Sequence, residues 1–198
     1  MTSRTKHIIF AQSNTMSTIP PLTGPPLYRY IPGVGRAVAV ECTGPGVAPL
    51  FGSFLSSTTQ SVGTTNPAAI TYSERTIGSI NVSNGTYPNS QIRIPTTGIY
   101  RVMFSAQCDS TSGAHELELF PVVNGTSVPD SNTRIRVTAG VESCLTAEYF
   151  LSFVAGDILQ LYMIGGSTNA KIVAISRSGG TPAVPNIPSI IVTIQRIG

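Results

Sequence analysis

The clearest pattern in the chain is an alternation of apolar and polar positions that begins near Leu50 and continues to the C-terminus. Within residues 98–108 the odd positions include Arg101, Ser105 and Gln107, and the even positions between them are apolar or small. A period of two places successive side chains on opposite faces, so this segment predicts a half-buried β-strand. The even positions that we assign to the core are Tyr100, Val102, Phe104, Ala106 and Cys108.

Shorter alternating segments recur along the chain, each bounded by turn residues. We expect the odd positions of 145–153 and 159–163 to face the core, and a turn at Gly156-Asp157 to join these two strands as a hairpin. Eight or so strands at this spacing predict an all-β fold, either a sandwich or a jelly roll. The other segments contain Ile80 and Val82, Ile92 and Ile94, Leu117 and Leu119, Ile135 and Val137, 171–175, and 188–197, where Ile190, Val192 and Ile194 should line the core.

The first quarter of the chain has a different composition. Residues 1–49 contain 7 Pro and 5 Gly. This composition suits an extended, polyproline-like backbone and does not suit a ladder or a helix. We therefore divide the chain into an extended N-terminal arm, 1–49, and a jelly-roll domain, 50–198. Apolar side chains would let the arm dock on a partner, and the candidates are Tyr28, Tyr30, Ile31 and Val38.

Size and composition agree with one domain plus an arm. The 198 residues are enough for one sizeable core and leave no room for a second. Charged residues make up 11% of the chain and hydrophobic residues 41%, so many surface positions must be uncharged and polar, as in β-sandwiches. The 19 Gly and 15 Pro interrupt the sequence too often for helices of ordinary length.

The formal charge of +3 lies in the arm, which carries Arg4, Lys6, Arg29 and Arg36 against Glu41, while the remainder has eight basic and eight acidic residues. Such dispersed cations do not favour direct nucleic-acid binding. No apolar run is long enough to span a membrane, and the arm offers only residues 8–11 as an apolar stretch, which is too short for a secretory signal.

The groups that catalysis needs are scarce, so we expect no enzyme. Histidine occurs only as His7 and His115, and a strand would place His115 beside Leu117 rather than beside a second ligand. The chain has no G-x-S-x-G motif, and neither of its two lysines lies in a phosphate-binding loop. The glycines of 33–36 begin a dinucleotide motif, but Val38 replaces its third glycine.

We expect no metal or cofactor. The acids Asp109, Glu142 and Asp157 are candidate calcium ligands, but their spacing fits no EF-hand loop and favours solvated turn acids. The three cysteines, Cys42, Cys108 and Cys144, lack metal-site spacing. We expect reduced, largely buried thiols, and an alternative is that Cys108 and Cys144 face each other across the sandwich. The sequons at Asn81, Asn84 and Asn124 are interpreted as turn asparagines.

Two motifs resemble the tumour-necrosis-factor and complement-C1q jelly roll. They are Pro-Thr-Thr-Gly-Ile-Tyr-Arg-Val-Met-Phe-Ser at 95–105 and Val-Ala-Gly-Asp-Ile-Leu-Gln-Leu at 154–161, and a closing apolar strand follows them. The resemblance covers about residues 50–198 and implies a single eight-stranded antiparallel jelly-roll sandwich. Gly98 would let the chain turn into the strand that carries Tyr100, and Gly156-Asp157 would supply a corner with positive φ.

The jelly-roll domain, residues 50–198, which we also call the body, resembles single-jelly-roll capsid proteins of large icosahedral DNA viruses as well. The resemblance lies in the ending Ile-Pro-Ser-Ile-Ile-Val-Thr-Ile at 187–194. We see no signal peptide, collagen-like stalk or membrane anchor, in contrast to the secreted relatives. The resemblance thus implies a protein of the virion that assembles in the host cytoplasm. About 150 residues are too few for a double jelly roll, so a penton or a minor or decorating capsid protein is expected.

We therefore expect a structural protein whose partners are itself, as a homopentamer or homotrimer, and neighbouring capsid proteins held by the arm. Phe150 and Tyr162 are the candidates for subunit packing. The alternative is a C1q-like or TNF-like trimeric recognition module, extracellular, that binds a receptor or a glycan. A carbohydrate-binding jelly roll is a third reading, and the absence of Trp disfavours it.

Overall fold

The computed structural model describes residues 28–30, 37–39 and 49–198 and divides the chain into two units, Met1–Ala48 and Pro49–Gly198. In the first unit β1 (Tyr28–Tyr30) pairs antiparallel with β2 (Ala37–Ala39). We expected no ladder in this proline-rich arm. It forms because neither segment contains proline, so every residue keeps the N–H group that a ladder needs.

The short ladder includes three of the four residues that we proposed for arm docking. Tyr28 lies opposite Ala39, and Val38 lies opposite Arg29. Ile31, the fourth, lies outside the described residues.

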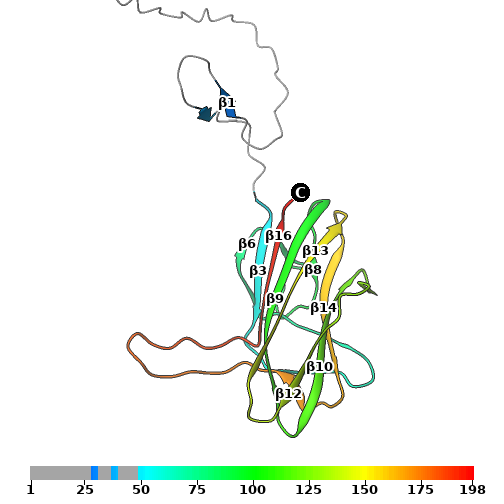
Figure 1. Ribbon diagram of the computed structural model, residues 1–198, viewed down its shortest axis with the longest axis vertical. Coiled ribbons are helices and arrows are strands. Elements are labelled where there is room, and N and C mark those ends of the chain that lie inside the picture. Colours follow the sequence, from blue (N-terminus) through cyan, green and yellow to red (C-terminus); the bar gives the residue numbers. More distant parts are fainter. Residues whose placement is uncertain (1–27, 31–36, 40–48) are drawn as a thin grey trace, which may run out of the picture. The chain divides into compact units, whose positions relative to one another are not determined.

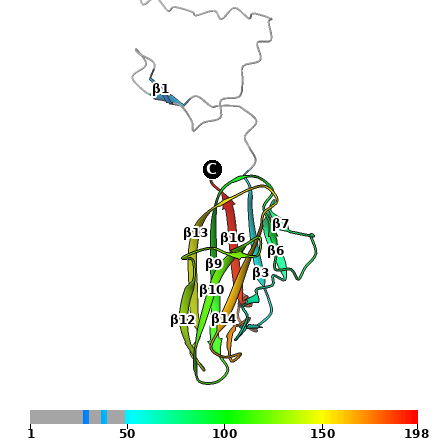
Figure 2. The same ribbon diagram turned by 90° about the vertical axis from the view of Figure 1, so that its right-hand side faces the viewer.

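The second unit is built from two antiparallel sheets, and the structure shows no helix among the described residues (Figures 1 and 2). Sheet 1 contains β3 (Phe51–Ser56), β4 (Gln60–Ser61), β6 (Glu74–Gly78), β9 (Gly98–Ser110), β13 (Ser143–Phe153), β15 (Ala170–Ile172) and β16 (Ile190–Arg196). Sheet 2 contains β5 (Ala68–Ala69), β7 (Asn81–Val82), β8 (Ile92–Arg93), β10 (Ala114–Val123), β11 (Thr126–Ser127), β12 (Thr133–Thr138) and β14 (Ile158–Gly165). Accordingly, no described helix could cross a membrane.

Four nested strand pairs define the topology. β3 pairs with β16, β8 with β14, β9 with β13, and β10 with β12. Each pair encloses the next one along the chain, so the polypeptide is an antiparallel ribbon rolled up on itself, which is the jelly-roll arrangement. The pairings of β16 with β9 and of β14 with β10 complete the two sheets. The eight-stranded antiparallel jelly roll is confirmed, and six further strands extend its sheets.

The predicted hairpin between residues 145–153 and 158–164 is wrong. Its turn forms, with Gly156 at φ 97° and the N–H of Asp157 donating to the carbonyl of Val154 at 3.0 Å. However, β13 pairs with β9 in sheet 1, whereas β14 pairs with β10 in sheet 2. The turn therefore carries the chain from one sheet to the other. Alternation shows which side chains of a strand face the core. It does not show whether two consecutive strands pair within one sheet or face each other from opposite sheets.

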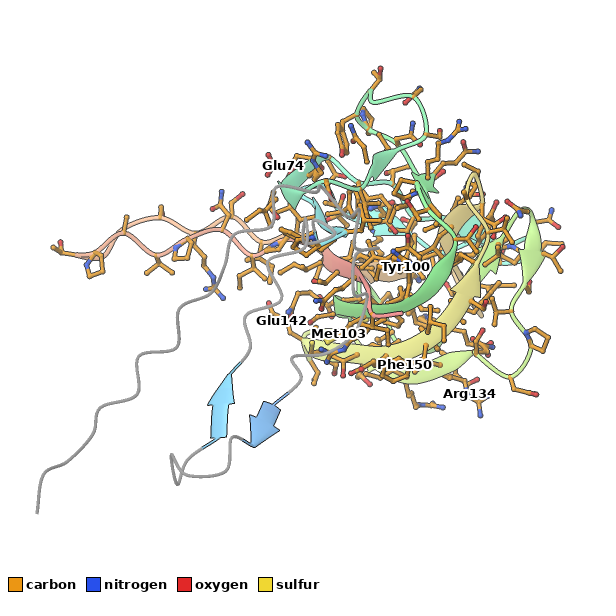
Figure 3. All side chains as sticks on the ribbon, turned by 90° about the horizontal axis from the view of Figure 1, so that it is seen from above. Glu74, Tyr100, Met103, Arg134, Glu142 and Phe150 are labelled. Atoms are coloured by element: carbon orange, nitrogen blue, oxygen red, sulfur yellow. The ribbon has the colours of Figure 1, made fainter. Side chains whose placement is uncertain are left out.

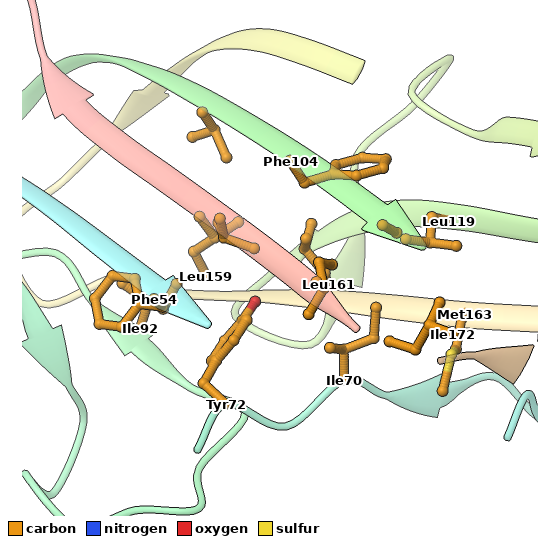
Figure 4. Packing of buried hydrophobic residues seen from close by; sticks show 14 of the residues in the cluster. Phe54, Ile70, Tyr72, Ile92, Phe104, Leu119, Leu159, Leu161, Met163 and Ile172 are labelled. Atoms are coloured by element: carbon orange, nitrogen blue, oxygen red, sulfur yellow. The ribbon is translucent and has the colours of Figure 1, made fainter. Parts of the chain in front are cut away.

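The core lies between the sheets and includes most of the inward positions that alternation predicted, together with Phe54, Ile70 and Tyr72, which the sequence analysis did not identify (Figure 4). All five even positions of β9 that we assigned to it are buried, from Tyr100 to Cys108. Leu159, Leu161 and Met163 of β14 are buried against them from the other sheet, as are Leu117 and Leu119 of β10. The predicted core positions of β16 are also fully buried, namely Ile190, Val192 and Ile194.

Candidate subunit interface

The outer face of sheet 1 carries an unusual number of apolar side chains, and we name it the apolar face. It consists of the outward positions of β13, β9, β16, β3 and β6, which pair side by side in that order. Four rows of residues cross it: Ser152, Ile99 and Ile197; Phe150, Arg101, Gln195 and Phe51; Glu148, Met103, Thr193, Ser53 and Ile77; and Thr146, Ser105, Ile191, Leu55 and Glu74.

Exposed apolar side chains are concentrated on this face. Among the described residues nine large apolar side chains are exposed, and six of them belong to it: Ile77, Ile99, Met103, Phe150, Ile191 and Ile197. Phe150 is the most exposed of the six at 63%, and it points outward from β13 (Figure 3). Single exposed apolar residues are common on monomeric proteins, but a contiguous group usually marks an interaction surface.

Two of the three charged residues in the four rows, Arg101 and Glu148, form an ion pair. Arg101 donates from Nε and Nη2 to the two carboxylate oxygens of Glu148, at 2.7 Å and 3.0 Å. This bidentate hydrogen bond from Arg101 lowers the pKa of Glu148. A paired charge costs much less to remove from water than an isolated one, so the ion pair leaves the face compatible with burial against another subunit.

The sequence contains a signal for this face that alternation alone did not reveal. Alternation assigned the odd positions of β9 to solvent, yet Ile99 and Met103 are both apolar and exposed. In β16 the run Ile190-Ile191-Val192 places apolar side chains on both faces, with Ile191 on the outside. Apolar residues out of phase with the core pattern were therefore the observation that could have located the face.

The two residues that we predicted for subunit packing lie on different sheets. Phe150 lies on the apolar face, whereas Tyr162 lies on β14 opposite Phe120 of β10, on the outer side of sheet 2. The rings of Tyr162 and Phe120 stack with centroids 6.3 Å apart, and both residues are half-buried. Tyr162 is thus partly covered by its own chain. Of the two predicted residues, only Phe150 belongs to the apolar face.

The structure corrects our expectation for the cysteines. Cys108 is buried on the inner side of β9, and burial raises the pKa of its thiol to about 12. Cys144 is exposed on the outer side of β13, where its sulfur lies 3.2 Å from Oγ of Ser105. The two thiols do not face each other across the sandwich, because β9 and β13 are neighbours in one sheet. Cys144 pairs with Gln107, the residue next to Cys108, so the two thiols lie on opposite faces of that sheet. Cys42 lies outside the described residues.

On sheet 2 the sequence His-Glu-Leu-Glu lies on β10, as predicted for a strand. Leu117 is buried, and Glu116 lies on the outer side, where its carboxylate binds Nη1 of Arg134 on β12 at 3.0 Å. The ring Nε2 of His115 lies 2.8 Å from the carbonyl oxygen of Ser112 in the preceding turn. Glu116 and Arg134 thus form a cross-strand ion pair, and His115 contacts the turn that precedes its strand.

The candidate calcium ligands are scattered in the structure. Asp157 accepts hydrogen bonds from the backbone N–H of Val154 at 2.7 Å and from the side chain of Asn124 at 2.8 Å, so it stabilises a turn. Asp109 accepts one from the N–H of Ser110. Within the part of the chain that is described, no three His, Cys, Asp or Glu side chains come together as a metal site would require.

Comparisons with known proteins give structural neighbours only. No family model matches the chain, and no curated protein does. Among solved structures, the globular domain of zebrafish complement 1qA protein is similar, with 14% sequence identity and a TM-score of 0.47 over 76% of this chain and 98% of that one. Eiger TNF from S. frugiperda is similar too, with 9% identity and a TM-score of 0.47 over 76% of this chain and 93% of that one. Both proteins carry the names of the families, C1q and TNF, that the two sequence motifs resemble, whereas the fold itself is assigned from the strand pairing.

Proposed function

We propose that this chain is a non-catalytic structural protein that assembles with copies of itself into a closed homo-oligomer through the apolar face. The observation that carries the proposal is the group of six exposed apolar side chains on one side of sheet 1. Burying them in a subunit contact would remove them from water, which is the main driving force of protein association. Cyclic assembly would also cover sheet edges that a monomer leaves open.

The charge of the body supports self-association. From Pro49 to the C-terminus, eight basic and eight acidic residues balance. Copies of the body therefore have no net charge to keep them apart at neutral pH. On the apolar face itself, Arg101 pairs with Glu148, which lowers the cost of removing these two charges from water, and Glu74 lies at the β6 edge of the face.

The setting that we propose is a viral shell, with the oligomer at a vertex or in a minor or decorating position. It is supported by the resemblance of residues 187–194 and by the proline-rich arm, whose apolar residues would hold neighbouring shell proteins. Copurification of the chain with intact virus particles through a density gradient is the expected result. Recovery of the chain only as a secreted protein on cell surfaces would contradict this setting.

A trimeric recognition module is the second candidate, because an apolar face on one sheet serves a three-fold assembly as well as a five-fold one. The mass of the native oligomer distinguishes trimer from pentamer directly. A trimer that binds a receptor or a glycan would favour the recognition module.

The interface itself is tested by Phe150→Gln, with Val154→Gln as the matched control. Both side chains are 63% exposed, but Val154 lies in the turn after β13 and outside the four rows. We expect Phe150→Gln to weaken self-association at least tenfold, as loss of about 1.4 kcal/mol would do, and Val154→Gln to leave it unchanged. Sedimentation velocity over a concentration series measures both. A wild-type chain that stays monomeric at high concentration, or equal behaviour of the two variants, would contradict the proposal.

A further inference from the structure

The connection between β15 and β16 interrupts a strand that is otherwise continuous. Ile172 of β15 pairs with Cys108, and Ile190 of β16 pairs with Ala106. Gln107 between them bonds to both flanks, because its carbonyl accepts from Val173 and its N–H donates to Ser189, each at 2.8 Å. Residues 174–188 therefore leave the ladder and return to it at the same position. We name these residues the projecting hairpin.

Hydrogen bonds within the projecting hairpin hold it in shape. Ile175 and Ile187 exchange two backbone hydrogen bonds of 2.9 Å at its base. Further out, the N–H of Arg177 donates to the side chain of Asn186 at 2.8 Å, and the N–H of Val184 donates to the carbonyl of Gly179 at 3.1 Å. Figures 1 and 3 show the hairpin extending away from the sandwich. It is thus a preformed element, which lowers the entropy cost of binding.

The tip of the hairpin has the composition of a contact surface. Every residue from 177 to 186 is exposed, and Arg177 is the only charged residue among them. The tip, residues 180–185, ends in Pro-Ala-Val-Pro at 182–185, and Val184 is 51% exposed. Two prolines restrict its backbone, so little conformational freedom is left to lose when it docks.

A small groove lies at the base of the hairpin and is formed mostly by residues of the hairpin itself. It has a volume of about 240 Å³, which is less than the roughly 300 Å³ at which pockets for drug-sized ligands begin. Its lining is apolar at Leu55 of β3 and at Ala174, Ile175, Ile187 and Pro188, and it is polar at Ser57, Glu74, Ser176 and Asn186. Leu55 also belongs to the apolar face, so the groove continues the surface through which we propose that copies meet.

We propose that the tip of the projecting hairpin docks into this groove on a neighbouring copy of the chain. This inference rests on the proposed self-assembly and names a second contact within it. The hairpin extends away from the sandwich, so its tip points away from the groove at its own base (Figure 1). A tip that meets a different surface on the next copy is a head-to-tail contact, and such contacts close into rings when the rotation allows it.

A disulfide test separates contacts between copies from contacts within one. In a background of Cys42→Ser and Cys144→Ser, one preparation carries Ala183→Cys and a second carries Ser57→Cys, and the two are refolded together and oxidised. Every disulfide between residues 183 and 57 must then join two chains. The control pair replaces Ser57→Cys with Thr126→Cys, an exposed position on β11 of sheet 2. We expect the groove pair to give at least ten times more linked dimer than the control pair, measured by intact mass.

The outcomes distinguish this inference from the function on which it rests. Native mass first shows whether the closed oligomer forms. An oligomer in which the groove pair links no better than the control pair overturns the hairpin contact and leaves the self-assembly standing. A protein that is monomeric by native mass overturns both.

Deletion of residues 174–188 gives a second readout. Joining Val173 to Ser189 leaves two residues opposite Gln107, which is the arrangement of a β-bulge, so we expect the β spectrum by circular dichroism to persist. The dissociation constant of the oligomer should rise at least tenfold, because the deletion removes both the tip and the hairpin residues that line the groove. An unchanged dissociation constant in the folded variant would overturn the inference, and the disulfide yields decide the matter if the variant does not fold.

Discussion

The hydroxyl group of Tyr72 is the single side-chain polar atom among the described residues that is buried without a hydrogen-bond partner. The ring packs against Phe54, with centroids 5.7 Å apart, in the centre of the core (Figure 4). Burial of the hydroxyl raises its pKa, so it remains protonated. An unsatisfied hydroxyl costs the free energy of its lost hydration without a bond in return.

Tyr72→Phe should therefore increase the free energy of unfolding, by about 1 kcal/mol. Tyr149→Phe is the matched control, because the Tyr149 hydroxyl donates to the carbonyl of Ser131 at 2.8 Å and lies 3.1 Å from Oγ1 of Thr133. Its loss should lower the free energy of unfolding by about 1 kcal/mol. Urea denaturation measures both, and a destabilised Tyr72→Phe would show that the hydroxyl has a partner.

The Glu148 carboxylate gives a prediction for pH. Its pKa is lowered by the hydrogen bonds from Arg101, so its contribution to stability is present above the ordinary carboxyl pKa and is lost as the pH falls through the lowered value. Glu148→Gln should thus reduce the stability at pH 7 more than in acid below that value. The effect is small because the side chains are 45% and 37% exposed. Urea unfolding at several pH values would contradict the assignment if the difference did not change with pH.

At the scale of elements, the β3–β6 pair depends on one glycine. Gly78 has φ 117°, and a Cβ at this position would lie 2.2 Å from the carbonyl oxygen of Phe51 on β3. The register of the pair also shifts between Ser53 and Phe54, as at a β-bulge. Both features allow the chain to turn after β6 toward β7 and so to pass from sheet 1 to sheet 2.

Gly78→Ala should destabilise the protein by about 3 kcal/mol, because the backbone conformation and the contact with Phe51 are both unfavourable. Gly140→Ala is the control. Gly140 also has positive φ, 76°, but its Cβ would meet open space, so the expected loss is about 1 kcal/mol. Equal losses in thermal or urea unfolding would show that β6 shifts to accommodate the side chain.

Elements also show the limit of sequence patterns. The strands and their inward faces follow from alternation along each segment, and Ile190, Val192 and Ile194 of β16 are buried as predicted. The partner of a strand does not follow in the same way. β13 and β14 are adjacent in sequence and belong to different sheets, because strand pairing is decided by segments far apart in the chain, here β9 and β10.

At the scale of the whole molecule, the described core belongs to the body. The cluster of buried apolar residues begins at Phe54 and ends at Ile194. Deletion of residues 1–49 should leave a folded β domain with unchanged cooperative unfolding, and it should weaken assembly or incorporation into particles. Circular dichroism and native mass measure the two effects. A truncated body that does not fold would place structural contacts of the core in the arm.

The sequence by itself determined that the protein is all-β, where most long strands lie and which of their side chains face inward, since these depend on neighbours two positions apart in the chain. Only the tertiary structure decided which strands share a sheet, and therefore that Cys108 and Cys144 lie on opposite sides of one sheet. The same holds for the apolar face, whose members come from five strands. Their proximity is set by ladder register between distant segments, and no local pattern records that register.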